Sequence, residues 1–453
     1  MSIVFGEIIY ADRKYHFEFE NNILQMYEFN SELISDLEQS IPLVALFPGE
    51  KPQIDSLTGV CYPDGHSIVF LDVVDAGTKN NVLLNRVSQY IEYKMLFCSS
   101  SPISGLSIQA DELNYIYPVG QTYNYTMNET GINSINLQAS TGDQQWVFNL
   151  NEIRVTVSFG IMQSFTHDES PLRLQSALYM EFEPTEDHEF ITRLFAIGRN
   201  FLRYVCYRRN INITKSSVYT HDGKRKFCPI GSFDAAWLHT DYPETKKRMQ
   251  RNYIPVSSLG TSLGYFFQKL SDDTLYLRHI PASIKDARGI TPAHSVMLTA
   301  AFEYEYHQLF PEGIKHKAKT QKKHELIKTG LDSLISDEKY DSVKKEFERA
   351  KNILTNDNLE AQLNQAFKEL SVCFESHAKS LFDLNETEYS TSIMAKTISK
   401  MRNDFAHGNI NIDYGKETFL SITILPYLIY AMQLKQAGLD ESEITKIIGK
   451  LLS

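Results

Sequence analysis

The stretch Ile393–Asn411 reads IMAKTISKMRNDFAHGNIN, and its pattern predicts a helix that ends at Gly408. Its apolar residues recur at steps of four, three and four, the period of one buried helical face: Met394, Ile398, Met401 and Phe405. Gly408 suits the left-handed backbone conformation that often follows the last helical residue. We therefore expect a helix that packs by one face and stops at Gly408.

Three polar side chains of this helix project outside the apolar stripe. At about 100° per residue, Arg402, Asn403 and His407 share an arc of roughly 140°. Arginine is a permanent cation whose planar fork fits phosphate oxygens, and histidine exchanges a proton near neutral pH. Such a pair has the chemistry to cleave RNA without a metal, because a base activates the 2′-hydroxyl while a cation stabilises the developing charge. An Arg and a His at a helix C-terminus are also ordinary partners of the helix dipole.

The composition indicates a soluble, multidomain chain. Its 453 residues are 42% hydrophobic and 12% aromatic, which is enough to bury large cores and argues against disorder. The net charge of −11 means that any RNA site must be a local basic patch. The N-terminus does not resemble a secretory signal, the apolar stretch 419–432 is too short to span a bilayer, and the five cysteines are scattered. These features predict a cytoplasmic protein that does not enter membranes.

Residues 1–185 alternate polar and apolar side chains in short runs, which predicts a β-rich sandwich or barrel-like domain. One hairpin is expected at 59–73, with the turn at Pro63-Asp-Gly65. Cys61 and His66 have the spacing of a zinc ligand pair, but no second pair follows at a familiar spacing. The tyrosines at 115, 117, 123 and 125 suit stacking on bases or sugars, or simply filling a half-buried sheet face.

The pattern predicts a mixed connector region at residues 186–285 and an all-α helical bundle at residues 286–453. Together with the β-rich front domain, this predicts an α+β fold class. Helices are expected at 292–309, 325–336, 338–354, 358–382, 416–436 and 440–451. Five lysines crowd the segment 315–324 and are candidates for contacts with an RNA backbone: Lys315, Lys317, Lys319, Lys322 and Lys323. The same cluster also suits the solvated start of a helix.

Arg402-Asn-Asp-Phe-Ala-His407 resembles the R-x4–6-H motif of HEPN domains, and its position late in a helical bundle before Gly408 is similar as well. The Ala-Ala-Phe-Glu303 helix resembles the acidic early helix of these domains. The β-rich front half, with the hairpin around Pro63-Asp-Gly65, is similar to the N-terminal domain of ApeA-type antiphage (abortive-infection) proteins. The resemblance therefore covers most of the chain.

The resemblance implies a metal-independent endoribonuclease with no cofactor, which cleaves RNA such as tRNA when infection supplies a phage-derived trigger. It implies Arg402, His407 and Asn403 as catalytic residues, paired with their copies across a homodimer or higher homo-oligomer. Glu303 is a candidate partner of Arg402, although it suits an exposed helix position equally well. Asp404 is a candidate to offset the repulsion between adjacent Arg and His pairs.

Two other functions are compatible with the sequence. The first is a non-catalytic HEPN module that binds RNA or nucleotides and acts through partners, which predicts binding without new RNA ends. The second makes the N-terminal β-rich domain a binder of carbohydrates or other ligands, a function that rests on the tyrosine pairs alone.

Overall fold

The structure is a computed structural model of the chain. It describes residues 3–28, 53–79, 82–128, 131–137, 144–165, 172–221, 227–235, 242–287, 289–314, 318–355, 358–409 and 414–452. The chain divides into two compact units, Met1–Thr274 and Leu275–Ser453. The sequence-based division placed its boundaries at 185/186 and 285/286.

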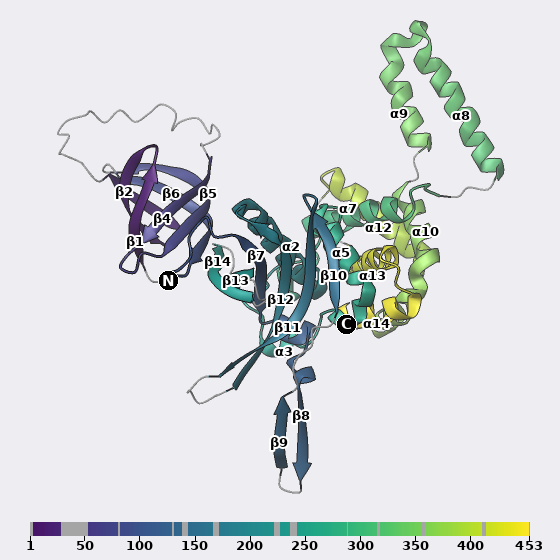
Figure 1. Cartoon of the computed structure of the whole chain (residues 1–453). Helices are drawn as coiled ribbons and strands as arrows, with labels where there is room; N and C mark the ends of the chain where they lie inside the picture. The colour runs from purple at the N-terminus through teal and green to yellow at the C-terminus, as the bar shows by residue number, and fades with distance from the viewer. Residues whose placement is uncertain are drawn as a thin grey trace. The chain divides into compact units, whose positions relative to one another are not determined.

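The N-terminal unit is mainly β (Figure 1). Its strands are β1 (Val4–Tyr10), β2 (Arg13–Glu20), β3 (Ile23–Glu28), β4 (Gln53–Cys61), β5 (Ser67–Lys79), β6 (Val82–Tyr93), β7 (Ile103–Ala110), β8 (Tyr123–Asn128), β9 (Gly131–Leu137), β10 (Gln145–Leu150), β11 (Ile153–Phe165), β12 (Leu172–Thr185), β13 (Ile213–His221) and β14 (Phe227–Ala235). Its helices are α1 (Leu113–Ile116), η2 (Val119–Thr122), α2 (His188–Cys206), α3 (Lys246–Met249), α4 (Val256–Leu259), η3 (Gly260–Ser262) and α5 (Leu263–Ser271).

The first six strands close into an antiparallel barrel. Within the described residues the order is β6-β3-β2-β1-β4-β5, and an additional pairing of β5 with β6 closes the ring. The expected hairpin is confirmed, because β4 pairs with β5 next to the turn and Val60 lies opposite Ser67. Of the two architectures that the alternation allowed, the structure thus has the barrel, within the predicted α+β class.

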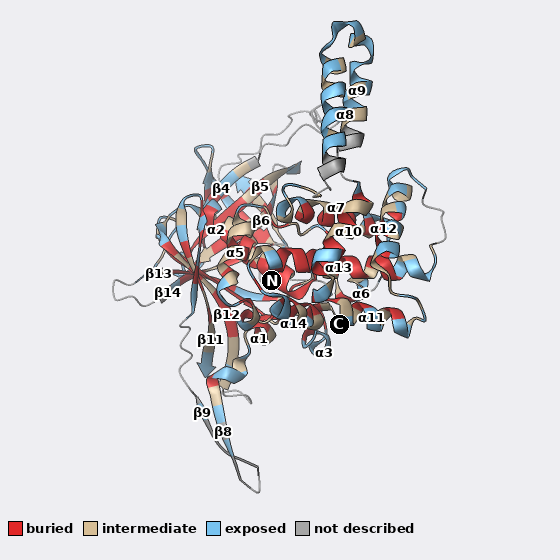
Figure 2. Cartoon of the chain, turned by 90° about the vertical axis from the view of Figure 1, so that its right-hand side faces the viewer, coloured by how far each residue is buried: buried red, intermediate tan, exposed pale blue. Residues whose placement is uncertain are grey.

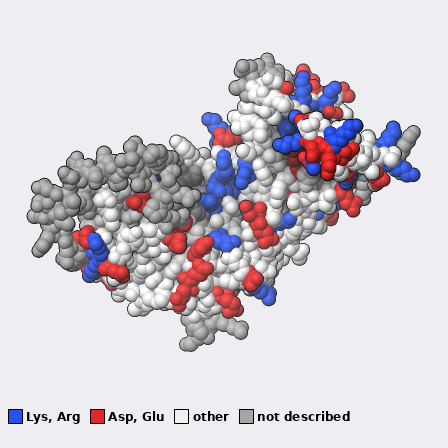
Figure 3. Space-filling view, turned by 90° about the horizontal axis from the view of Figure 1, so that it is seen from above, with Lys and Arg blue, Asp and Glu red and all other residues white. Residues whose placement is uncertain are grey.

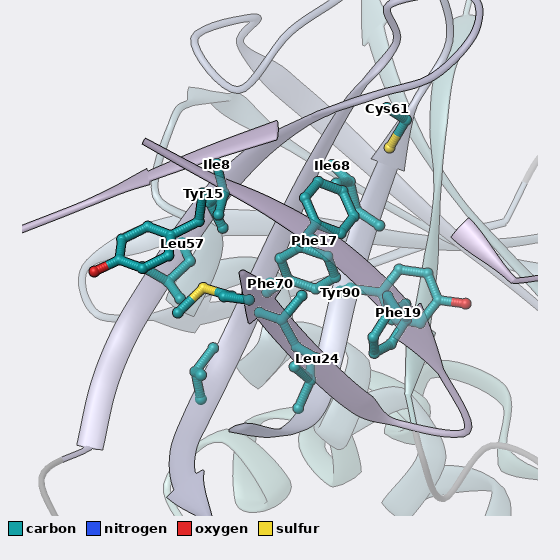
Figure 4. Packing of buried hydrophobic residues seen from close by; sticks show 13 residues of the cluster. Ile8, Tyr15, Phe17, Phe19, Leu24, Leu57, Cys61, Ile68, Phe70 and Tyr90 are labelled. Carbon is teal, nitrogen blue, oxygen red and sulfur yellow. The ribbon is translucent and has the colours of Figure 1, made fainter. Parts of the chain in front are cut away.

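Alternate side chains of these strands fill the barrel (Figure 4). Phe17 and Phe70 meet edge to face at 5.5 Å between ring centroids, and Phe19 meets Tyr90 at 5.1 Å. Each of these rings is at most 8% exposed. Because side chains on a strand point alternately to opposite faces, the polar–apolar alternation of the sequence places the aromatic residues inside.

β6 belongs both to the barrel and to an open sheet. One edge of β6 pairs with β5 along most of its length. The other edge pairs with β3 from Val82 to Arg86 and with β14 from Gln89 to Tyr93. From β14 the sheet continues as β13, β7, β12, β11 and β10. The predicted connector region 186–285 therefore supplies two strands of this sheet.

Helix α2 packs on one face of the open sheet. Phe195 stacks on Phe233 of β14 with 4.6 Å between ring centroids. A Cβ atom at Gly198 would lie 2.5 Å from Cδ1 of Ile108, so any larger residue there would require the Ile108 side chain to shift. Asp187 caps the helix by accepting a hydrogen bond from the Phe190 backbone N–H. The strand residues facing α2 are apolar, as a helix-covered sheet face requires.

The C-terminal unit is helical (Figure 2). Its elements are α6 (Ile284–Ala287), α7 (Pro292–Leu309), α8 (Ala318–Ser336), η4 (Glu338–Val343), α9 (Lys344–Thr355), α10 (Leu359–Leu370), η5 (Ser371–Cys373), α11 (Glu375–Leu384), α12 (Thr391–Ala406), α13 (Lys416–Gln436) and α14 (Glu441–Leu452). Helix α13 packs against α7, α10, α12 and α14 at the centre of the bundle. By length and hydropathy alone α13 could cross a membrane, but 72% of its most apolar window is buried inside the protein, as in a core helix.

The predicted single helix at 358–382 is wrong, because the chain breaks between Leu370 and Phe374. Both residues leave helical geometry, with φ of −124° and −141°. Cys373 and Phe374 are fully buried, and the Phe374 ring lies 6.3 Å from Phe367 and 6.4 Å from Tyr427 between centroids. Tertiary packing of this turn outweighs the local three–four periodicity that predicted a continuous helix.

Helices α8 and α9 form a hairpin that packs on itself and on η4. Its described side chains are all at least partly exposed, in contrast to the bundle helices (Figure 2). Lys351 of α9 forms an ion pair with Asp332 of α8. The hairpin contributes surface and no buried core residue within its described side chains.

Candidate active site at the end of α12

Helix α12 forms and ends as its sequence predicts. Ser390 caps the N-terminus by accepting a hydrogen bond from the Ile393 N–H at 3.4 Å. The side chains of Met394, Ile398 and Met401 are at most 2% exposed. At the other end Gly408 takes a φ of +76°, and its N–H donates to the Phe405 carbonyl at 3.1 Å. This glycine ends the helix and leaves the last turn at the protein surface.

Arg402 and Glu303 come together from two helices. Glu303 lies on α7, and its Oε2 is 3.8 Å from Nη2 of Arg402. The two side chains are 33% and 40% exposed, so water competes with this loose contact. Arg402 Nη1 also donates to Oδ1 of the neighbouring Asn403 at 3.4 Å. A guanidinium has five N–H donors, so Arg402 retains donors for a phosphate.

His407 caps the C-terminus of α12, directly after the last helical residue Ala406. Its backbone N–H donates to the Asn403 carbonyl at 3.0 Å, and its side chain is exposed. Among the residues that the structure describes, the imidazole forms no hydrogen bond or ion pair with another side chain. At about 1.5 Å per residue, His407 lies roughly 7.5 Å along the helix axis from Arg402. One copy therefore presents one cation and one imidazole on the exposed surface of the last turns of α12.

Asp404 faces a different neighbour. Tyr414, which lies just before α13, donates from its hydroxyl to Oδ2 of Asp404 at 3.4 Å. Partial burial and the nearby carboxylate both raise the pKa of Tyr414. The Tyr414 ring meets Phe405 edge to face at 5.2 Å between centroids. Sequence reasoning missed Tyr414, because a tyrosine ten residues after Asp404 shows no local signal of the contact.

A small cavity of about 240 Å³ lies on the buried side of α12. Its lining is mostly apolar and includes Met401, Phe405, Tyr414, Phe419 and Ile422. Arg402, Asn403 and His407 do not line it. The candidate catalytic side chains therefore lie on the open surface of the helix end.

The five candidate RNA-binding lysines fall in and before α8. Lys315 and Lys317 lie outside the described residues, and Lys319 lies in α8, where its side chain is not described. Lys322 and Lys323 are exposed. Lys and Arg side chains are interspersed with Asp and Glu on the face drawn in Figure 3. Any basic surface on this face is thus local, as the net charge of the chain requires.

Cys61 and His66 do not form a metal site together. Cys61 is fully buried in the barrel core, where burial raises the pKa of its thiol to about 12. His66 instead contacts Asp64 and Glu92. Among the residues that the structure describes, no group of three or more His, Cys, Asp or Glu side chains is arranged to hold a metal ion.

Residues 296–443 match the family model described as Apea-like HEPN. This region is an ApeA-like HEPN domain. The matched residues of the HEPN domain include Glu303, Arg402 and His407, and all lie in the C-terminal unit. A search of curated proteins and a search of solved structures each found no match.

Proposed function

We propose that this protein is a metal-independent endoribonuclease of antiphage defence, acting in the cytoplasm on structured RNA such as tRNA. The observation that carries the proposal is the surface pair of Arg402 and His407 at the end of α12, inside an ApeA-like HEPN domain. A phage-derived trigger would start cleavage. The N-terminal unit would sense that trigger or restrain the nuclease.

The proposed reaction is an attack of the RNA on its own backbone. The His407 imidazole accepts the proton of the 2′-hydroxyl, and the resulting oxygen attacks the adjacent phosphorus. Arg402 stabilises the extra negative charge on the phosphate oxygens as the bond to the 5′-oxygen breaks. That oxygen takes up a proton, so the products are a 2′,3′-cyclic phosphate and a 5′-hydroxyl.

The neighbours of Arg402 have supporting roles in this scheme. The Asn403 amide accepts from Arg402 at 3.4 Å through its oxygen, which leaves its NH₂ group to donate to a phosphate oxygen. Glu303, at 3.8 Å, holds the guanidinium until a phosphate replaces the carboxylate. A phosphate competes well here because the ion pair is long and half-exposed.

A homodimer would complete the site. One copy offers one base and one cation, whereas the departing 5′-oxygen needs a proton donor on the other side of the phosphate. A two-fold axis near the end of α12 would place the partner's His407 and the partner's Arg402 there. Sedimentation that finds only monomer at micromolar concentration, with the enzyme active, would remove this two-copy site.

Cleavage in EDTA tests the reaction directly. Purified protein, activated by co-expression with phage components, is incubated with total RNA, and new ends are mapped by sequencing. We expect Arg402→Ala and His407→Ala to lower the cleavage rate at least about 100-fold, the lower range for losing a general base or an oxyanion donor. Lys400→Ala is the matched control, because Lys400 is an exposed cation of the same helix.

The chemistry of the RNA ends separates the possible outcomes. A 2′,3′-cyclic phosphate and a 5′-hydroxyl would support the proposed attack. A 5′-phosphate, or cleavage unchanged in both variants, would contradict it. Tight RNA binding without any new ends would favour the non-catalytic HEPN module instead.

The lysines of α8 are tested by the salt dependence of RNA binding. We expect Lys322→Ala with Lys323→Ala to weaken binding and to lower the slope of log Kd against log salt by about 1.5, because two phosphate contacts are lost. Lys344→Ala with Lys345→Ala is the control pair, since both residues are exposed on α9. An equal change in both double variants would place the RNA elsewhere.

A further inference from the structure

A cleft of about 530 Å³ lies in the N-terminal unit, where the open sheet leaves the barrel. Its lining comes from the turn between β4 and β5 and from β6, β11, β13 and β14, with part of the loop after β6. The volume is in the range of about 300–1,000 Å³ that is typical of sites for small organic ligands. All of these elements belong to the one unit, so the cleft is formed within a single fold.

The floor of the cleft is a polar row that crosses neighbouring strands. Glu92 of β6 lies opposite Ser232 of β14, which lies opposite Ser217 of β13. Residues next to this row, such as Phe233, face α2. Because side chains alternate between the two faces of a sheet, the serine row lies on the face opposite α2. That face offers hydroxyl groups where the α2 face offers an apolar core.

Both carboxylates of the cleft lie next to the His66 imidazole. His66 lies between them, with Nδ1 2.5 Å from Oδ1 of Asp64 and Nε2 3.0 Å from Oε1 of Glu92. The His66 side chain is only 15% exposed, so these contacts hold it in place. Asp64 is thus hydrogen-bonded to the imidazole, and Glu92 lies against the other ring nitrogen.

Two lysines supply the uncommitted charge. Lys94 and Lys215 both line the cleft and are exposed. Among the residues that the structure describes, neither ammonium group has a carboxylate within ion-pair distance. An ammonium group is a strong donor to phosphate oxygens, and two of them at one cleft favour a ligand with several negative oxygens.

The remaining lining suits an organic body. Met95 and Met162 contribute thioethers and Tyr219 contributes a ring. Methionine sulfur packs well against flat aromatic groups. We propose that this cleft is a binding site for a nucleotide-sized organic phosphate, with its phosphates on Lys94 and Lys215 and its base among the methionines. This site goes beyond the proposed nuclease function, and binding to it requires no RNA cleavage.

Titration of the full chain with N-methylanthraniloyl-ATP, followed by fluorescence anisotropy, tests the proposal. We expect saturable binding that weakens at least tenfold in the double variant Lys94→Ala/Lys215→Ala and recovers in Lys94→Arg/Lys215→Arg. The control pair Lys246→Ala/Lys247→Ala removes two exposed cations of α3 in the same unit and should bind like the parent. Thermal unfolding of each variant checks that the fold is intact.

Three results would overturn the proposal. One is the absence of saturable binding up to millimolar probe, and another is equal weakening in the cleft pair and the control pair. The third is binding that Arg402→Ala abolishes and the cleft variants leave intact, which would place the nucleotide in the HEPN domain. Competition gives the last check, in which unlabelled ATP should displace the probe. If tripolyphosphate displaces the probe equally well, the nucleobase does not contribute to binding, and its proposed contact with the methionines is refuted.

Discussion

The arginine–glutamate pair Arg208–Glu112 of the N-terminal unit and the pair Arg402–Glu303 of the C-terminal unit differ in nearly every physical respect. In the N-terminal unit Arg208 donates to Glu112 at 2.9 Å, with side chains only 1% and 2% exposed. In the HEPN domain Arg402 lies 3.8 Å from Glu303, with side chains 40% and 33% exposed. Glu112 also accepts from the Asn212 backbone N–H, so its carboxylate is held from two directions.

The difference indicates which arginine is available for chemistry. Burial raises the pKa of Glu112, and the guanidinium of Arg208 opposes that rise. Neither partner can leave without stranding a charge in the protein interior. Arg402 can exchange its carboxylate for a phosphate at little cost, because water already screens the pair. The buried pair therefore has a structural role, whereas the loose pair is suited to binding.

The largest expected effect is on the buried pair. Arg208→Ala leaves the Glu112 carboxylate unpaired, and we expect it to lower the free energy of unfolding by about 3–5 kcal/mol. Urea unfolding of the full chain measures the loss. The double variant Arg208→Met/Glu112→Gln, which removes both charges, should recover part of it. A loss no larger than that of Arg402→Ala would abolish the distinction between the two pairs.

Buried and exposed histidines extend the comparison within the C-terminal unit. His279 is fully buried, and burial lowers its pKa to about 3, whereas His407 is exposed. In the unfolded chain a histidine takes up a proton near pH 6.5, so below that pH the unfolded state binds more protons than the folded state. Stability is therefore lost as the pH falls from about 6.5 towards 3. By pH 5 we expect a loss of about 2 kcal/mol from this residue.

The measurement is the urea midpoint at pH 7.5 and at pH 5. His279→Gln should reduce the difference between the two midpoints, whatever it does to stability at pH 7.5. His307→Gln, at an exposed position of α7, serves as the control. An unchanged pH difference in His279→Gln would show that other groups cause the acid sensitivity.

The smallest stability effect is expected at the candidate active site. Arg402→Ala should change the free energy of unfolding by less than about 1 kcal/mol, because exposed ion pairs contribute little. Calorimetry and the cleavage assay, carried out on one preparation of the variant, give its free energy of unfolding and its cleavage rate. A loss of several kcal/mol would mean that Arg402 supports the fold, and any loss of activity would then need another explanation.

Local sequence was sufficient for the elements whose signals lie within one helix or one hairpin. The apolar stripe and Gly408 predicted α12 and its end, and Thr291 with Pro292 explains why α7 begins at Pro292. The turn at Pro63-Asp-Gly65 predicted the β4–β5 hairpin. The contact of Arg402 and Asn403 with RNA stays a prediction, because it depends on the bound RNA.

Other features depend on contacts between residues far apart in the chain. Arg208 and Glu112 are 96 residues apart, and no local pattern shows that they meet. Both β3 and β14 pair with the same edge of β6, and these strands are also far apart in the sequence. The same holds for the cleft, because Lys94 follows β6 and Lys215 lies in β13.

The physical reason for this division is the range of the interactions. Periodicity, caps and turn residues act over a few positions, so the sequence alone determined α12, its polar arc and the β4–β5 hairpin. Burial, strand pairing and ion-pair geometry require the whole fold. Only the tertiary structure therefore decided that Arg208 is enclosed with its glutamate, that Arg402 remains open beside Glu303, and that Lys94 and Lys215 share a cleft.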